Sequence, residues 1–256
     1  MIKMIKRTIL LGWITAALLI WLMQATAVDA KFRNAVNFED NEFVGMNNIE
    51  LLHRIQSIED GAPTLSDRTE LQYEISYGIL QNYEIGLNVP VVFNEDDSND
   101  VGDVGIVQRF KFSEKETFFM DSSGGLEFIL PTGSDGSDPP TGTDDLDFRI
   151  FGSIGNQFRP NWDWLANAGF TLVGDDDIDD EFTYNTAVRY RVLNELKAVA
   201  EINGKSGGLA DETQISISPG LIAQPTQGLS LHFSLPIGVN SDAPDHSALI
   251  ELAVEF

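Results

Sequence analysis

From residue 49 onward, apolar residues alternate with polar or small ones in one segment after another. In ELQYEISYGI, residues 70–79, every odd position is apolar and every even position is polar or small. This period of two is typical of a β-strand whose two faces meet different surroundings. The pattern recurs up to the final ALIELAVEF. After residue 30 no apolar stretch reaches the roughly 18–20 residues that a membrane-spanning helix needs. The sequence therefore predicts an all-β fold.

The connections between these segments alternate in length. Short connections such as LQN, RPN and LNE follow long acidic ones such as EDGAPTLSD, PTGSDGSDPPTGTDD and GDDDIDDE. A soluble β-sandwich gives no reason for this sorting, whereas an outer-membrane barrel has short periplasmic turns and long extracellular loops. We therefore predict a transmembrane antiparallel up-and-down β-barrel of about twelve strands, with both chain ends on the periplasmic side.

The N-terminus predicts export. A cationic segment, MIKMIKR, precedes the apolar run TILLGWITAALLIWLM and the small residues of QATAVDA, which is typical of a Sec-type signal peptide. Cleavage is expected after Ala27 or, as the alternative, after Ala30; an uncleaved membrane anchor is the other interpretation. The predicted division is a signal peptide over 1–27, a periplasmic segment or plug over 28–48, and a β-barrel over 49–256.

Charge and composition exclude several classes of function. The chain has 16 Lys and Arg against 40 Asp and Glu, a net charge of -24. Cleavage after Ala27 removes Lys3, Lys6 and Arg7 and no acid, so the net charge becomes -27. Nucleic acid is excluded as a partner because phosphate binding needs clustered cations. There is no cysteine, so disulfides and thiol chemistry are absent. The acidic loops fit no calcium-loop pattern, and we predict no metal site and no cofactor; weak binding of divalent cations by these loops is the alternative to plain solvation.

Aromatic residues gather at both ends of the predicted strands, as the interfacial girdles of a membrane barrel do. Beside the short turns lie Tyr77, Tyr83, Phe112, Phe118, Phe158, Trp162, Tyr190 and Phe256. Toward the long loops lie Phe93, Phe128, Phe148, Phe170 and Phe182.

Prolines interrupt several strand patterns, where each removes a donor from the sheet ladder. They are Pro90, Pro131, Pro219 and Pro236. In a closed wall they are expected to mark a local break, with a lateral opening as one interpretation, or else the ends of strands near the loops.

Several motifs resemble known outer-membrane proteins. The terminal Phe256 with Ile250, Leu252 and Val254 resembles the strand that the barrel-assembly machinery of Gram-negative bacteria recognises. EFILPTGSDGSD, VGDVGIVQRFKF and ISPGLIAQPTQGLSLHFSLPIGVNSDAPDH resemble the outer-membrane transporter family named after the meta-pathway of phenol degradation, over roughly residues 45–256. The resemblance implies a barrel that passes small, often aromatic or otherwise hydrophobic compounds, without identifying the solute.

Charged residues on the inward parity of the strands form the candidate site. Assuming hairpins centred on the connections, we expect Glu84 to face Lys111, Arg109 to face Asp121, and Glu127 to face Arg149. These charges either fill and neutralise a narrow interior or form a constriction that sets selectivity. The predicted pore-lining residues are Glu74, Glu84, Arg109, Lys111, Asp121, Glu127, Asp147, Arg149, Arg189, Arg191 and Glu201.

The predicted function is passive passage of small organic compounds across the bacterial outer membrane. The expected partners are outer-membrane lipid, lipopolysaccharide, the barrel-assembly machinery and a small organic solute. The alternatives are a structural or adhesive barrel without transport, and an outer-membrane lipid-modifying enzyme. Asp245, His246 and Ser247 are the candidate catalytic residues for such an enzyme, because they are adjacent and have the side-chain types of a catalytic triad. Adjacent strand residues point to opposite faces, so His246 and Ser247 do not form a base–nucleophile pair, and no catalytic residue is predicted.

Overall fold

The computed structural model describes residues 43–59, 68–94, 99–113, 120–134, 141–176, 178–208 and 213–256. The predicted signal peptide over 1–27, both cleavage sites and residues 28–42 of the predicted periplasmic segment lie outside this part of the chain. Within the described ranges, no helix is long and apolar enough to cross a membrane.

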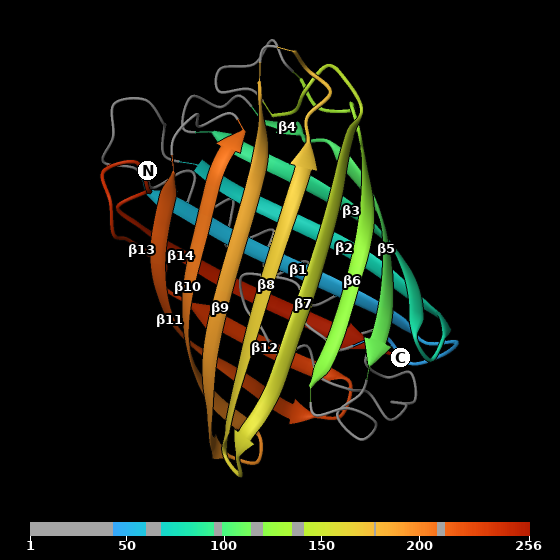
Figure 1. Ribbon diagram of the computed structural model, residues 1–256, viewed down its shortest axis with the longest axis vertical. Coiled ribbons are helices and arrows are strands. Elements are labelled where there is room, and N and C mark those ends of the chain that lie inside the picture. The colour runs from blue at the N-terminus through green and yellow to red at the C-terminus, as the bar shows by residue number, and fades with distance from the viewer. Residues whose placement is uncertain are drawn as a thin grey trace.

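The described strands form one antiparallel sheet that closes on itself (Figure 1). Of its fourteen strands, β4 (Asn99–Val101) and β13 (Ile237–Gly238) are short. The other twelve make up the wall, which confirms the predicted barrel of about twelve strands. They are β1 (Ile49–Glu59), β2 (Arg68–Leu80), β3 (Tyr83–Asn94), β5 (Val104–Ser113), β6 (Asp121–Leu130), β7 (Asp147–Arg159), β8 (Trp162–Leu172), β9 (Asp179–Leu193), β10 (Leu196–Gly208), β11 (Gln214–Thr226), β12 (Leu229–Ser234) and β14 (His246–Glu255).

The first and last strands close the wall. β14 pairs with β12 on one side and with β1 on the other, from Glu50 opposite Glu255 to Glu59 opposite His246. The closure continues to the last residue, where the backbone N–H groups of Ile49 and Phe256 each donate to the other's carbonyl at 2.9 Å. Because no strand of the wall is left as an edge, an apolar C-terminal strand carries no risk of edge-to-edge aggregation.

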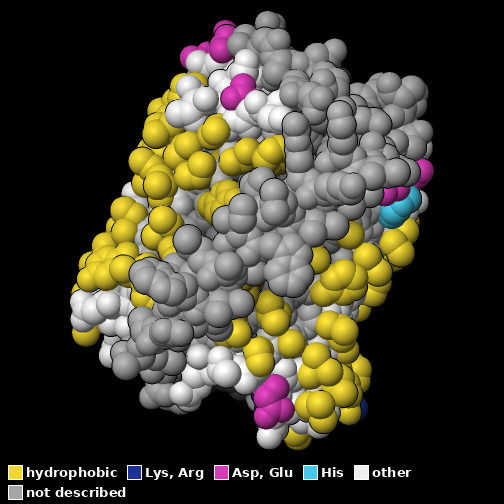
Figure 2. All heavy atoms as spheres, turned by 180° about the vertical axis from the view of Figure 1, so that it is seen from behind, with side chains coloured by type: hydrophobic (Ala, Val, Ile, Leu, Met, Phe, Trp, Pro, Cys, Tyr) yellow, Lys and Arg dark blue, Asp and Glu magenta, His cyan; other side chains and the backbone are white. Residues whose placement is uncertain are grey.

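The two faces of the wall differ in the way that the alternation predicts. In β2, Ile75 is 52% exposed on the outside, whereas Glu74 on the inside is 6% exposed. Figure 2 shows hydrophobic side chains over the flank of the barrel, with the visible acidic side chains nearer its ends. An outer surface of this kind suits a lipid environment, in which apolar side chains need no hydration.

The barrel has a short-turn end and a long-loop end. In Figure 1 the short turns that join β7 to β8 and β9 to β10 lie at the bottom.

Part of the interior is apolar, which the alternation did not predict. This internal apolar cluster lies on the inward parity of β8, β9, β10, β11 and β14 and consists of Leu165, Ala187, Val199, Ile222 and Leu249.

The prolines occupy both of the predicted kinds of position. Pro236 breaks the wall locally, because β12 ends two residues before it and β13 begins directly after it. The carbonyl of Pro219 accepts the N–H of Leu235 at 3.0 Å, and that of Pro236 accepts the N–H of Ser247 at 2.8 Å. Pro131 follows the last residue of β6 and therefore marks a strand end.

The connection between β6 and β7 is held by Asp103, which sequence reasoning did not single out. Its carboxylate accepts the backbone N–H groups of Thr132 at 3.0 Å, Gly133 at 2.8 Å and Thr143 at 2.7 Å. A Cβ atom on Gly142 would lie 2.3 Å from Asp103 Oδ1, so this approach requires glycine. One carboxylate therefore fixes both ends of the loop that contains the PTG sequence.

Replacing Asp103 by alanine is expected to release this loop. Because the lost hydrogen bonds involve a charged acceptor but are only partly buried, we expect a loss of about 2 kcal/mol in the free energy of unfolding. Limited proteolysis of the folded barrel in detergent, followed by mass spectrometry, measures cleavage between β6 and β7. The matched control is Asp100→Ala, since that exposed carboxylate accepts the N–H of its neighbour Val101. Equal cleavage in the two variants would show that Asp103 does not hold the loop.

Candidate functional site

The predicted pore-lining residues all lie on the inward parity of their strands. Glu84, Glu127 and Glu201 are buried, and Lys111 and Arg149 are half-buried. Arg191 lies on the same parity near the short-turn end and is exposed. The other lysines and arginines of the described strands share this parity, apart from Arg159, which lies beside a short turn where the strand register shifts. The interior therefore gathers charge, while the lipid-facing wall is apolar.

Two of the three expected cross-strand pairs are wrong. Glu84 lies opposite Arg109 rather than Lys111, and Arg109 lies opposite Gly125 on its other side rather than Asp121. The connection from β3 to β5 contains β4, and the register shifts between Lys111 and Ser113, so neither hairpin is centred on its loop. The third pair is present, since Glu127 lies opposite Arg149. Their ion pair measures 3.3 Å.

Arg109 joins two buried carboxylates from neighbouring strands. Its Nη1 lies 2.9 Å from Glu74 Oε1 and 2.9 Å from Glu84 Oε1. The hydroxyl of Ser76 also donates to Glu74 at 2.8 Å. Ion pairs removed from water gain strength from such additional hydrogen bonds, which offset the cost of desolvation. We call this group the Arg109 network.

The chain before β1 lies against the inside of the wall near the short-turn end. The N–H of Val44 donates to Glu84 Oε2 at 2.7 Å, and that of Gly45 donates to Glu255 Oε1 at 2.9 Å. The side chains of Phe43 and Val44 are 5% and 4% exposed. A Cβ atom on Gly78 would lie 2.2 Å from the carbonyl oxygen of Gly45, so only glycine lets the chain approach this closely. We call residues 43–45 the N-terminal arm.

A second charged group crosses the seam where the barrel closes. Arg54 donates to Glu251 Oε2 through Nε at 2.9 Å and Nη2 at 2.6 Å, and to Gln72 Oε1 at 3.2 Å. His232 Nδ1 lies 3.1 Å from Glu251 Oε1. His232 points inward, as its parity predicts. The sequence analysis did not include Arg54 or Glu251 among the pore-lining residues. The alternation in β14 could have identified Glu251, because Ile250 faces outward and its neighbour must therefore face inward.

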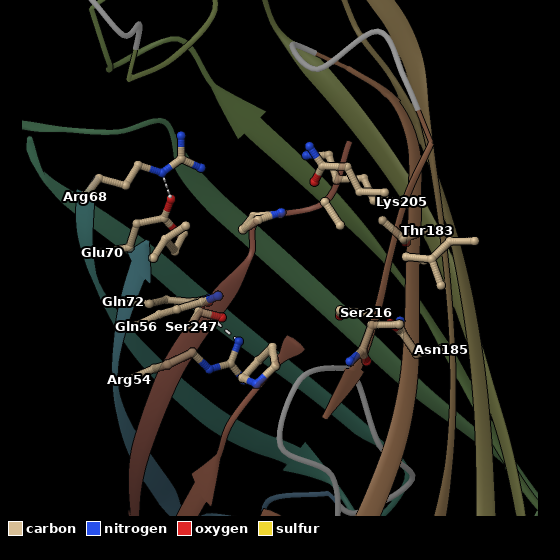
Figure 3. Close-up of a pocket in the computed structure, with 18 of the residues that line it drawn as sticks. Arg54, Gln56, Arg68, Glu70, Gln72, Thr183, Asn185, Lys205, Ser216 and Ser247 are labelled. Atoms are coloured by element: carbon tan, nitrogen blue, oxygen red, sulfur yellow. Dashed lines mark hydrogen bonds and ion pairs between the residues drawn. The ribbon is translucent and has the colours of Figure 1, made fainter. Parts of the chain in front are cut away.

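A cavity of about 400 Å³ lies within the barrel toward the long-loop end. Figure 3 shows Arg54, Gln56, Arg68, Glu70 and Gln72 on one side of it and Thr183, Asn185, Lys205 and Ser216 on the other. The first group comes from β1 and β2, and the second from β9, β10 and β11. Of the predicted pore-lining residues, Glu74 and Arg149 line this space. Amides, hydroxyls and charged groups thus converge in the long-loop half.

His246 and Ser247, two of the candidate catalytic residues, lie on opposite faces of β14. The side chain of His246 is 62% exposed and lies 2.9 Å from the equally exposed Glu59. Ser247 points inward and is 6% exposed. Because the histidine does not reach the hydroxyl, this pair cannot activate a nucleophile. In the part of the chain that the structure describes, no three His, Asp or Glu side chains are arranged to hold a metal ion.

The closed antiparallel wall, apolar outside and charged inside, is the fold of outer-membrane β-barrels. An outer membrane channel from Pseudomonas putida F1 superposes with a TM-score of 0.70 at 14% sequence identity, over 87% of this chain and 100% of that one. The KdgM porin gives 0.56 at 8% identity, and the NanC porin 0.54 at 10%, each over 81% of this chain and 98% of the porin. At such low identity these likenesses establish the fold alone.

A family assignment narrows this class. The family described as "Putative MetA-pathway of phenol degradation" matches residues 57–256, and the chain belongs to it. The resemblance drawn from the sequence motifs is therefore confirmed. No curated protein sequence matched the chain.

Proposed function

We propose that the protein is a channel of the bacterial outer membrane through which small organic compounds pass without an energy source. The observation that carries this proposal is a closed barrel whose charged side chains face inward and whose long-loop half contains a polar cavity of about 400 Å³. The family to which the chain belongs, described by a pathway of phenol degradation, supports small aromatic or otherwise hydrophobic organic compounds as candidate solutes. In the same proposal, lipid and lipopolysaccharide surround the wall. The barrel-assembly machinery recognises the outward residues of the last strand, Ile250, Leu252, Val254 and Phe256.

One observation favours a second candidate, a structural barrel without transport. The internal apolar cluster, the Arg109 network and the N-terminal arm are all buried inside the wall. Reconstitution into planar lipid bilayers separates the two candidates. Discrete ion-conducting events and uptake of small organic solutes into vesicles are expected of a channel. A folded, heat-modifiable barrel that passes neither ions nor solutes would leave the structural role as the better account.

Replacing Glu127 by glutamine is expected to shift the ion selectivity of the channel toward anions. The substitution removes a negative charge from the inner wall and leaves Arg149, which is 22% exposed, with one carboxylate fewer beside it. Fixed charges that line a narrow path set its ion preference. Reversal potentials measured across a salt gradient report the change. Glu195→Gln is the control, because that exposed residue lies in the turn between β9 and β10. An unchanged reversal potential in the Glu127 variant would place this pair outside the conducting path.

A further inference from the structure

Two cations that line the cavity, Arg54 and Arg149, are more exposed than the carboxylates with which they form ion pairs. The side chain of Arg54 is 21% exposed and its partner Glu251 is 1% exposed. Arg149 is 22% exposed against 8% for Glu127. Arg54 and Arg149 line the cavity, whereas Glu127 and Glu251 are not among its lining residues. The buried acids therefore hold the guanidinium groups in place without covering the sides that face the cavity.

Lys205 repeats this arrangement on the opposite side. Its Nζ lies 2.6 Å from Glu181 Oε2, and it is 42% exposed against 23% for the glutamate. Lys205 lines the cavity and Glu181 does not. Figure 3 shows Lys205 across the space from Arg54 and Arg68. An anion inside the cavity would therefore meet cations on two sides.

The acids that do line the cavity are held by cations of their own. Glu70 lies 2.7 Å from Arg68, and Glu74 belongs to the Arg109 network. Among the described residues, the lining itself carries four cations, Arg54, Arg68, Arg149 and Lys205, against the two carboxylates Glu70 and Glu74, so the groups that face the cavity are positive on balance.

Neutral hydrogen-bonding groups fill the wall between the cations. Gln56, Asn185 and Ser216 offer both donors and acceptors to the space. Asn203 donates to Ser218 at 2.8 Å, while its Oδ1 is buried and has no hydrogen-bond partner among the described residues. The accessible amides and hydroxyls of this wall can exchange hydrogen bonds with a ligand that carries hydroxyl groups.

We propose that the cavity is a binding site for a small organic carboxylate that also carries hydroxyl groups. This inference rests on the proposed function and deepens it by naming the solute class. The carboxylate accepts charge-assisted hydrogen bonds from Arg149 and Lys205, and the hydroxyl groups pair with the polar side chains of the wall, such as Asn185 and Ser216. A purely apolar solute is rejected, because it would strip water from these polar groups and return no hydrogen bonds.

Titration calorimetry on the full barrel in detergent, with gluconate and gluconamide as probes, tests the site. The two probes share their hydroxyls and shape, and only gluconate carries a negative charge. We expect gluconate to bind the wild type about tenfold more tightly, which corresponds to about 1.4 kcal/mol. Arg149→Gln and Lys205→Gln should each remove most of that difference while leaving gluconamide binding unchanged. Arg159→Gln is the matched control, since it changes the same residue type in the same strand outside the cavity lining.

Several outcomes would overturn the inference. They are equal affinities for the two probes, no binding of either probe, and full retention of gluconate binding in Lys205→Gln. Lys205 is more exposed than Arg54 and Arg149, so Lys205→Gln should disturb folding least. Heat modifiability checks that each variant is folded. The site and the proposed function fail separately. Selective gluconate binding without conductance would contradict the channel function and support the binding site. Conductance without selective binding would contradict the binding site and support the channel function.

Discussion

Replacing Arg109 by methionine is expected to lower the free energy of unfolding of the barrel by about 3–5 kcal/mol, the usual cost of breaking a buried ion pair from one side. The Arg109 side chain is 5% exposed, and its partners Glu74 and Glu84 are 6% and 1% exposed. Without the guanidinium, two carboxylates on adjacent strands keep their negative charges close together, with little water to stabilise them. Equilibrium unfolding in urea with lipid vesicles, followed by tryptophan fluorescence, measures the loss.

Two further variants test this explanation. Arg191→Met removes another inward cation, but Arg191 is exposed, so we expect a change of less than about 0.5 kcal/mol. Adding Glu74→Gln and Glu84→Gln to Arg109→Met removes the uncompensated charge and should restore most of the stability, because neutral or apolar replacements of buried ion groups are often tolerated. If the single Arg109 variant unfolds at the wild-type urea concentration, the network does not stabilise the wall.

The architecture was readable from the sequence because a barrel in lipid imposes a strict alternation. A register error of one residue would place Glu74 in lipid and Ile75 in the interior, so both the sequence and the fold fix which face each residue occupies. The sorting of long and short connections has a separate origin, since membrane barrels carry short turns at one end and long loops at the other. Together the two patterns gave the number of strands and the closure of the barrel, without knowledge of any contact between side chains.

Side-chain pairing was less readable, because it depends on small offsets between strands. The expected Glu84–Lys111 pair is wrong by two residues, and the alternation does not detect this error, since a shift of two keeps every residue on its face. The bulge beside Lys111 and the insertion of β4 set the true register. Neither feature has a distinct sequence signal in one chain.

Contacts across long sequence separations were missed altogether. Arg54 and Glu251 are 197 residues apart and meet only because the barrel closes. Asp103 reaches 30 residues forward to Gly133 and 40 to Thr143. The internal apolar cluster was missed for a different reason. The sequence analysis took the inward positions as polar, whereas Leu165, Ala187, Val199 and Ile222 lie on the inner face of four consecutive strands and belong to one buried cluster.

The interior therefore has two halves with different physical character. Near the short turns the N-terminal arm lies against the Arg109 network, and Lys111 Nζ lies 5.9 Å above the ring of Phe43. Toward the long loops the polar cavity provides space and hydrogen-bonding groups. A solute that enters from the long-loop end meets the cavity first and the arm afterwards. Passage then depends on how far the arm narrows the path, and this dependence can be tested directly.

Replacing Phe43 and Val44 together by alanine is expected to raise the single-channel conductance several-fold, or to create conductance if the wild type passes no ions. Both side chains are at least nine-tenths buried inside the wall, so truncating them opens space along the path. The hydrogen bonds from the backbone N–H groups of Val44 and Gly45 to Glu84 and Glu255 do not need these side chains, so the arm should stay in place. Current steps in planar bilayers measure the effect.

The matched control for the arm is Met46→Ala. Met46 directly follows the arm and is 49% exposed, so its truncation should leave the current steps unchanged. A wider path should also reduce the energy barrier for larger ions, and therefore the arm variant should conduct large organic ions that the wild type and the control exclude. If the arm variant folds, shows the wild-type heat modifiability and gives wild-type current steps, the arm lies beside the path and the constriction must be formed by the wall itself.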